Sequence, residues 1–144
     1  LFEITDAVLS VWGASRVGVH LSPRGDTHDM GDSDPAALFN YMARGLGERK
    51  IAFICAREHQ GDDALGVELK KSFGGVYIAN EGFTFASANQ VIADGVADAV
   101  AFGQLFIANP DLPKRFRLGA ELNAPNPATF YGSTAEGYTD YPAL

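Results

Sequence analysis

The chain has 144 residues, of which 47% are apolar, and its formal net charge at pH 7 is −7. This length suits a single domain, residues 1–144, with a core of its own. The negative charge argues against nucleic acid or an anionic membrane surface as a partner, because both select basic protein faces.

Two further absences narrow the class of protein. The single cysteine, Cys55, excludes an internal disulfide and a cysteine-based zinc site. It also fits a reducing compartment. No apolar run approaches the roughly 18 residues that a membrane span requires. We therefore expect a soluble cytoplasmic protein.

Helical and strand patterns alternate along the chain. In order, we expect a helix over 2–12, a strand over 16–21, a helix over 35–46, a strand over 51–55, a helix carrying Leu65, Leu69 and Phe73, a strand over 76–79, a helix from Thr84 to Gly95, a strand over 98–102 and a helix over 110–118. From Ala120 onward the composition predicts an irregular tail.

The predicted helices carry recognisable end signals. Gly13 and Gly119 stand where C-cap glycines would, and Asp34-Pro35 matches an N-cap followed by proline at the first helical position. Residues with helical spacing should form the buried stripe of the helix over 35–46, namely Leu38, Tyr41, Met42 and Leu46. Gly47 should end that helix.

Alternation of strands and helices indicates βαβ units and an α/β fold with a parallel sheet of about four strands. The strands read as unbroken apolar runs, as expected where helices cover both faces of a sheet. Such units can form an open doubly wound sheet or half of a (β/α)8 barrel. The local pattern alone leaves both architectures open.

In either architecture, ligands bind at the carboxyl ends of the strands. The candidate segments are 20–23, 55–58, 79–82 and 102–104. Gly82 and Gly103 follow successive strands, where main-chain N–H groups could hold a phosphate. The competing interpretation is that both are ordinary turn residues.

His20 and the acidic loop give weaker signals. Strand alternation should turn His20 to the face opposite Val19 and Leu21, where a lone histidine is more often structural than catalytic. Histidines 28 and 59 lack ligand spacing, so we expect no metal site. Residues 26–34 lack the ligand order of a calcium loop, which favours a solvated loop with a helix cap. No P-loop, dinucleotide motif or nucleophile elbow is present.

Three motifs in order give a family resemblance over nearly the whole chain. They are Val17-Gly18-Val19-His20-Leu21-Ser22-Pro23, the stretch from Ala101-Phe102-Gly103-Gln104 to Asn109-Pro110-Asp111-Leu112-Pro113, and the tail from Tyr131 to Pro142. Together they resemble the fifth strand, the eighth strand with its helix, and the C-terminal segment of the Old Yellow Enzyme family. The chain looks most similar to bacterial xenobiotic, N-ethylmaleimide and nitrate-ester reductases.

The resemblance implies the C-terminal half of a (β/α)8 barrel that holds FMN non-covalently. NAD(P)H would reduce the flavin, which would reduce activated C=C bonds, nitro compounds or nitrate esters. By position in the family, the cofactor-binding residues would be His20, Asn80, Glu81, Gly82, Gly103 and Gln104. Main-chain N–H groups around Glu81-Gly82 and Gly103-Gln104 would hold the phosphate, and Tyr131 would line the substrate side.

Three residues depart from the family pattern. Many relatives have arginine where this chain has His20 and Gln104. Histidine is positively charged only when protonated, and glutamine brings no charge, so another cation such as Arg24 would have to compensate. Glu81 places a carboxylate beside the expected phosphate, which requires its side chain to point away.

The resemblance also implies what these residues do not supply. The His or His/Asn pair that anchors substrate and the proton-donating Tyr belong to the family's first half, so we expect no catalytic residue here and no activity from this piece alone. An isolated half-barrel would expose strand edges and an apolar face, favouring self-association. The alternatives are another phosphate-binding barrel, such as an aldolase or isomerase, and a stand-alone half-barrel that is inert or pairs with another chain.

Overall fold

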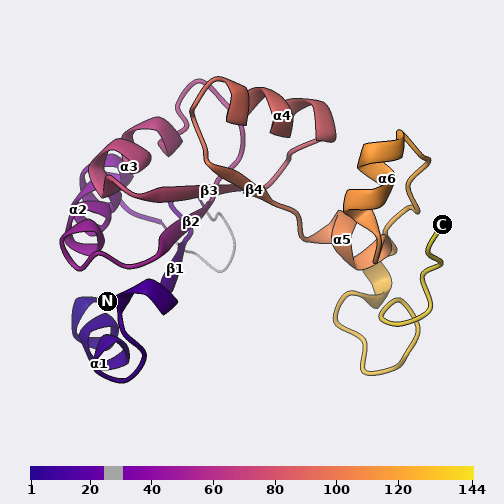
Figure 1. The fold of residues 1–144 in the computed structure, drawn as a ribbon, viewed down its shortest axis with the longest axis horizontal. Helices are drawn as coiled ribbons and strands as arrows, with labels where there is room; N and C mark the ends of the chain where they lie inside the picture. Colours follow the sequence, from indigo (N-terminus) through magenta and orange to yellow (C-terminus); the bar gives the residue numbers. More distant parts are fainter. Residues whose placement is uncertain (25–30) are drawn as a thin grey trace. The chain divides into compact units, whose positions relative to one another are not determined.

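The computed structural model describes residues 1–24 and 31–144 (Figure 1). The chain divides into two compact units, Leu1–Ala101 and Phe102–Leu144, and each is described by itself. Among the described residues, no helix is long and apolar enough to cross a membrane. The expectation that 1–144 form one domain stays a prediction.

The first unit is built on a parallel four-stranded sheet with the strand order β1-β2-β3-β4. The strands are β1 (Gly18–Leu21), β2 (Phe53–Arg57), β3 (Val76–Asn80) and β4 (Ala99–Ala101). A doubly wound sheet reverses its strand order at a switch point, whereas successive strands of a barrel wall stay adjacent. The order therefore confirms a section of a (β/α)8 barrel and decides between the two architectures.

Helices precede and follow these strands as the sequence predicts. They are α1 (Phe2–Trp12), the 3-10 turn η1 (Ala14–Arg16), α2 (Pro35–Glu48), α3 (Gly66–Phe73) and α4 (Phe85–Ala93). The predicted helix end at Gly47 is wrong, because α2 continues to Glu48 and Arg49 is its C-cap residue. The predicted helix starts are confirmed: Asp34 Oδ1 accepts from the Ala37 N–H at 3.0 Å, and Thr84 forms a capping box with Ser87. Each cap satisfies main-chain groups that would otherwise lack partners at the helix start.

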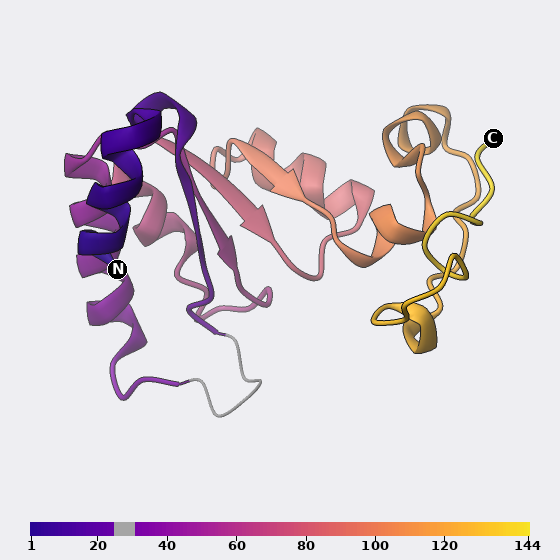
Figure 2. The same cartoon turned by 90° about the horizontal axis from the view of Figure 1, so that it is seen from below.

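The two faces of the sheet have different environments (Figure 2). Ile54 and Ala56 of β2 and Tyr77 and Ala79 of β3 are buried on the face covered by helices. Residues at the alternate positions are only partly buried, since strand side chains point to opposite faces in turn. Register then places His20, Cys55 and Ile78 side by side on the less covered face.

Contacts with α1 correct the prediction for Tyr41. This residue is 59% exposed, although Leu46 of the same predicted stripe is fully buried. The Tyr41 ring meets the edge of Phe2 of α1, with centroids 5.6 Å apart, at the flank of the helix. Phe2 also lies under the Arg49 guanidinium and occupies the space left by the missing side chain of Gly45. The prediction failed because helical spacing alone does not locate a neighbouring helix.

Two strand starts are also corrected. The strand predicted over 51–55 runs over Phe53–Arg57, because the chain turns at Lys50, whose φ is +54°, and joins the ladder with Phe53 opposite Gly18. The strand predicted over 16–21 starts at Gly18, since Ala14–Arg16 form the 3-10 turn. Both errors concern ends, which apolar runs define poorly.

The second unit contains α5 (Gln104–Ala108), α6 (Leu112–Leu118) and the 3-10 turn η2 (Pro127–Thr129). The sequence predicted only a connector where α5 lies, so this helix was missed; its five residues are too few to show a helical period. Buried Arg115 of α6 donates to the carbonyl oxygens of Glu121 and Pro142, at 2.5 and 2.7 Å. These bonds fix the tail, which is irregular as predicted.

The packing of α2 against α3 generates a stability prediction. A Cβ added at Gly47 would overlap the main-chain carbonyl oxygen of Phe73, which ends α3. Gly47→Ala should lower the free energy of unfolding by about 1–3 kcal/mol, the usual cost of overpacking. Urea unfolding measures the change. Gly31→Ala, where no atom lies within 4 Å of the added Cβ, should stay within about 0.5 kcal/mol of the parent protein; equal effects of the two variants would contradict this account.

Candidate functional site

Polar side chains meet at the carboxyl ends of β2, β3 and β4. Arg57 is the register partner of Asn80, and Asn80 is the register partner of Ala101. Asn80 Nδ2 donates to the Ala101 carbonyl oxygen at 2.9 Å, and the Asn80 carbonyl oxygen accepts from the Glu58 N–H at 3.1 Å. Asn80 thus joins the ends of three strands, and the loop that follows it starts from a fixed point.

The loop after β3 has unusual backbone geometry. Glu81 and Gly82 have positive φ angles of 90° and 76°. Within the described part of the chain, the N–H groups of these two residues donate to no acceptor. The buried ring of Phe83 and the Thr84 cap of α4 hold the far end of the loop. Two successive free N–H groups in such a turn can bind an anion.

The Glu81 side chain is engaged by its neighbour on β2. Arg57 Nη2 lies 3.0 Å from Glu81 Oε1, and both side chains are about one third exposed. Gln60 Nε2 donates to the Glu81 carbonyl oxygen at 3.4 Å. The carboxylate that the sequence places beside the expected phosphate is therefore compensated by a guanidinium.

The other predicted residues of the first unit lie as follows. His20 is exposed, while the next residue, Leu21, is buried, which confirms the predicted alternation. Arg24, proposed as a compensating cation, donates to the Asp63 carbonyl oxygen at 2.9 Å and also pairs with the Asp63 carboxylate. The charge of Arg24 is thus matched within the loop after β2.

Three predicted site residues belong to the second unit. Gly103 is the N-cap residue of α5, and its carbonyl oxygen accepts from the N–H groups of Phe106 and Ile107. Among the described residues, no acceptor binds the N–H of Gly103 or of Gln104. The Tyr131 side chain is 99% exposed. Joint action of these residues with the Gly82 loop stays a prediction.

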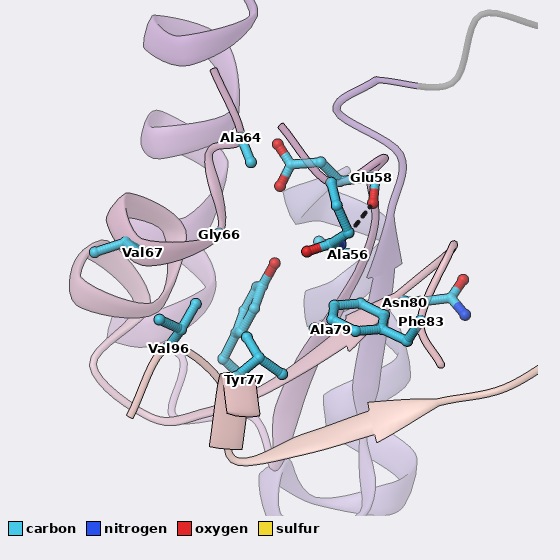
Figure 3. Close-up of a pocket in the computed structure, with 12 residues that line it drawn as sticks. Ala56, Glu58, Ala64, Gly66, Val67, Tyr77, Ala79, Asn80, Phe83 and Val96 are labelled. Atoms are coloured by element: carbon cyan, nitrogen blue, oxygen red, sulfur yellow. Dashed lines mark hydrogen bonds between the residues drawn. The ribbon is translucent and has the colours of Figure 1, made fainter. Parts of the chain in front are cut away.

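Sequence reasoning missed the roles of Glu58 and Tyr77. A small pocket, open to solvent, lies on the helix side of the sheet and is lined by these two residues, Phe83 and others (Figure 3). Glu58 is 3% exposed, and its Oε1 accepts from the Leu65 N–H just before α3. Burial raises the pKa of the Glu58 carboxyl and of the Tyr77 hydroxyl. The one signal in the sequence was a charged residue directly after an apolar strand.

The described residues, 1–24 and 31–144, contain no group of three His, Cys, Asp or Glu side chains placed to hold a metal ion. His28 and most of the acidic loop over 26–34 lie outside them.

Comparisons with known proteins agree with this geometry. No family model matches the sequence. The chain is 44% identical to 12-oxophytodienoate reductase 1 of Oryza sativa subsp. japonica, over 99% of this chain and 40% of the relative. It is 42% identical to 12-oxophytodienoate reductase 2 of Arabidopsis thaliana, with the same two coverages.

Solved structures give the same result. The Old Yellow Enzyme from Trypanosoma cruzi superposes with a TM-score of 0.93 and 37% identity, over 99% of this chain and 39% of that one. Morphinone reductase in complex with tetrahydroNAD superposes with a TM-score of 0.92 and 43% identity, over 99% of this chain and 39% of that one. The Old Yellow Enzyme homologue from Zymomonas mobilis superposes with a TM-score of 0.94 and 38% identity, over 99% of this chain and 42% of that one.

Fold and likeness together define the class: the chain is a section of a (β/α)8 barrel whose strand ends carry free main-chain donors. It belongs to the Old Yellow Enzyme family and corresponds to the C-terminal portion of these proteins. The chain spans about two fifths of the length of the curated relatives it matches.

The buried Glu58 carboxyl gives a pH prediction. Its pKa in the folded protein lies above the usual value of 4.5 because burial disfavours the charged form. The stability that its protonation contributes is present below pH 4.5. It is lost as the pH rises through the pKa of Glu58 in the folded protein. Glu58→Gln, whose amide oxygen can still accept from Leu65, removes this loss.

Urea unfolding of the parent and of Glu58→Gln, from pH 4.5 to pH 8, tests this. Relative to the variant, the parent protein should lose stability across that range. Glu3→Gln on the exposed side of α1 is the control and should run parallel to the parent. A parallel profile for Glu58→Gln would show that Glu58 does not titrate differently on folding.

Proposed function

We propose that the protein containing these residues is a cytoplasmic, FMN-dependent NAD(P)H oxidoreductase that reduces activated C=C bonds, and also nitro compounds or nitrate esters. The observation that supports this most directly is the pair of free N–H groups at Glu81 and Gly82, at the carboxyl end of a barrel strand. Relatives of this stretch are named as oxophytodienoate and morphinone reductases, and one was solved with a nicotinamide analogue.

The residues present fit the phosphate end of FMN. Gly82 has no atom within 4 Å of an added Cβ, so its surroundings leave room for a ligand to approach the backbone. The Glu81 carboxylate is already paired with Arg57 and so presents less negative charge to an anion. Neutral N–H groups next to a compensated carboxylate can donate to the oxygens of a phosphate without desolvating an unpaired charge.

FMN, when bound, would supply the hydride chemistry, and the chain would supply binding and orientation. The N–H groups at Glu81-Gly82 and Gly103-Gln104 would hold the phosphate. Asn80 would keep the strand ends in register, while His20 would lie toward the flavin. Tyr131 would line the substrate side. We assign no catalytic residue within this chain and expect none of the activity from these residues alone.

Purification of the full-length protein tests this function. The protein should be yellow, with a flavin spectrum, and it should oxidise NAD(P)H in the presence of an electron-poor alkene. A colourless protein that FMN does not reconstitute would contradict the proposal. Flavin-free turnover of a phosphorylated sugar would instead support the aldolase or isomerase alternative.

Gly82→Val tests the role of the loop. A β-branched residue at φ 76° costs about 1–2 kcal/mol, and relief of that strain would move the N–H groups away from the phosphate. The dissociation constant for FMN should rise about tenfold, measured by fluorescence titration of the apoprotein.

Gly95→Val is the matched control. Gly95 has φ 72° and no atom within 4 Å of an added Cβ, but it lies at the opposite end of α4. It should lose similar stability and keep the affinity for FMN. Equal loss of affinity in both variants would mean that general destabilisation, and not the phosphate loop, weakens binding.

A further inference from the structure

Glu81 has a backbone conformation that side chains disfavour. Among the described residues, Lys50 and Glu81 are the non-glycine residues with positive φ, and the value at Glu81 is 90°. An L-residue in this region brings its Cβ close to main-chain atoms, so surrounding contacts must hold it there. Gly82, which follows directly, can adopt its φ without this cost.

The contacts that hold Glu81 come from β2 and the loop after it. Arg57 Nη2 binds Glu81 Oε1 at 3.0 Å, and Gln60 Nε2 donates to the Glu81 carbonyl oxygen at 3.4 Å. Register places Arg57 beside Asn80, the residue just before Glu81. The side chain of Glu81 is therefore tied to β2, and its carbonyl oxygen is tied to the loop after β2.

The charge of the pair is also arranged for an anion. Without Arg57, the Glu81 carboxylate would stand unpaired beside the free Gly82 N–H and would repel a phosphate there. Arg57 uses Nη2 for Glu81, while in the described part of the chain its Nε and Nη1 donate to no side chain or carbonyl. Arg24 already pairs with Asp63, whereas Arg57 is paired with the loop itself, through Glu81.

We propose that Arg57 is a positioning residue for the phosphate end of the cofactor: through its ion pair it holds Glu81 at positive φ and cancels the carboxylate charge. The Glu81–Gly82 loop then presents no uncompensated negative charge to an anion. This inference rests on the proposed function, since it concerns the same phosphate group. Arg57 acts on the phosphate through Glu81, so replacement of Glu81 should remove the need for Arg57.

A double-mutant cycle in the full-length protein tests the coupling. Arg57→Met should raise the dissociation constant for FMN about tenfold and leave that for riboflavin, which lacks the phosphate, unchanged. Glu81→Gly, which removes both the carboxylate and the strained side chain, should bind FMN at least as tightly as the parent. The double variant should return to within about threefold of the parent, and Arg57→Lys should rescue part of the loss.

A merely structural role for Arg57 gives a different result. FMN and riboflavin would then weaken together, and Glu81→Gly would not rescue Arg57→Met; either outcome overturns the proposal. Arg44→Met, on the exposed side of α2, is the matched control for loss of one arginine and should change neither affinity.

A ligand-free readout separates this inference from the proposed function. The ¹³Cα chemical shift of residue 81 reports its backbone conformation and should change in Arg57→Met but not in Arg44→Met. Absence of any preference for FMN over riboflavin in the parent protein would contradict the phosphate site itself. An unchanged shift at residue 81 in Arg57→Met would overturn the role of Arg57, whatever the affinity for FMN.

Discussion

The site depends on the way Asn80 ties the ends of neighbouring strands together. Its carbonyl oxygen accepts from the Glu58 N–H after β2, and its side-chain amide donates to the Ala101 carbonyl oxygen at the end of β4. Hydrogen bonds to buried or half-buried main-chain groups are costly to lose, so these contacts fix where the strands stop. The loop from Glu81 to Phe83 then starts from a defined position, which in turn fixes where the N–H groups of Glu81 and Gly82 lie.

The two faces of the sheet serve different purposes around this point. On the helix side, Glu58 accepts from the Leu65 N–H, and Tyr77 fills the space between the sheet and α3. On the opposite face, register aligns His20 with Cys55 and Arg57 with Asn80. Arg57, the last residue of β2, and Glu58, which follows it, therefore act on opposite sides. One compensates charge at the candidate phosphate loop, and the other holds the helix that supports the strand.

Much of this arrangement could be predicted from sequence because its signals are local. Asp34-Pro35 and Thr84 mark helix starts through their own side chains, and apolar runs alternate with helical stripes. What failed depends on distant neighbours: Tyr41 lies at the flank of α2, against Phe2 of α1, and helical spacing alone does not show this. The pairing of Arg57 with Glu81, 24 residues apart, follows from strand register, which no local pattern encodes. The short helix α5 offered too few residues to show a period.

The central claim is that the main chain at Glu81 and Gly82 binds the phosphate of FMN. Amide NMR of the ¹⁵N-labelled full-length apoprotein, titrated in parallel with FMN and with riboflavin, tests it most directly. The account predicts that the resonances of Glu81 and Gly82 move on addition of FMN and stay in place with riboflavin. Equal movement with both ligands, or none with FMN, would contradict it.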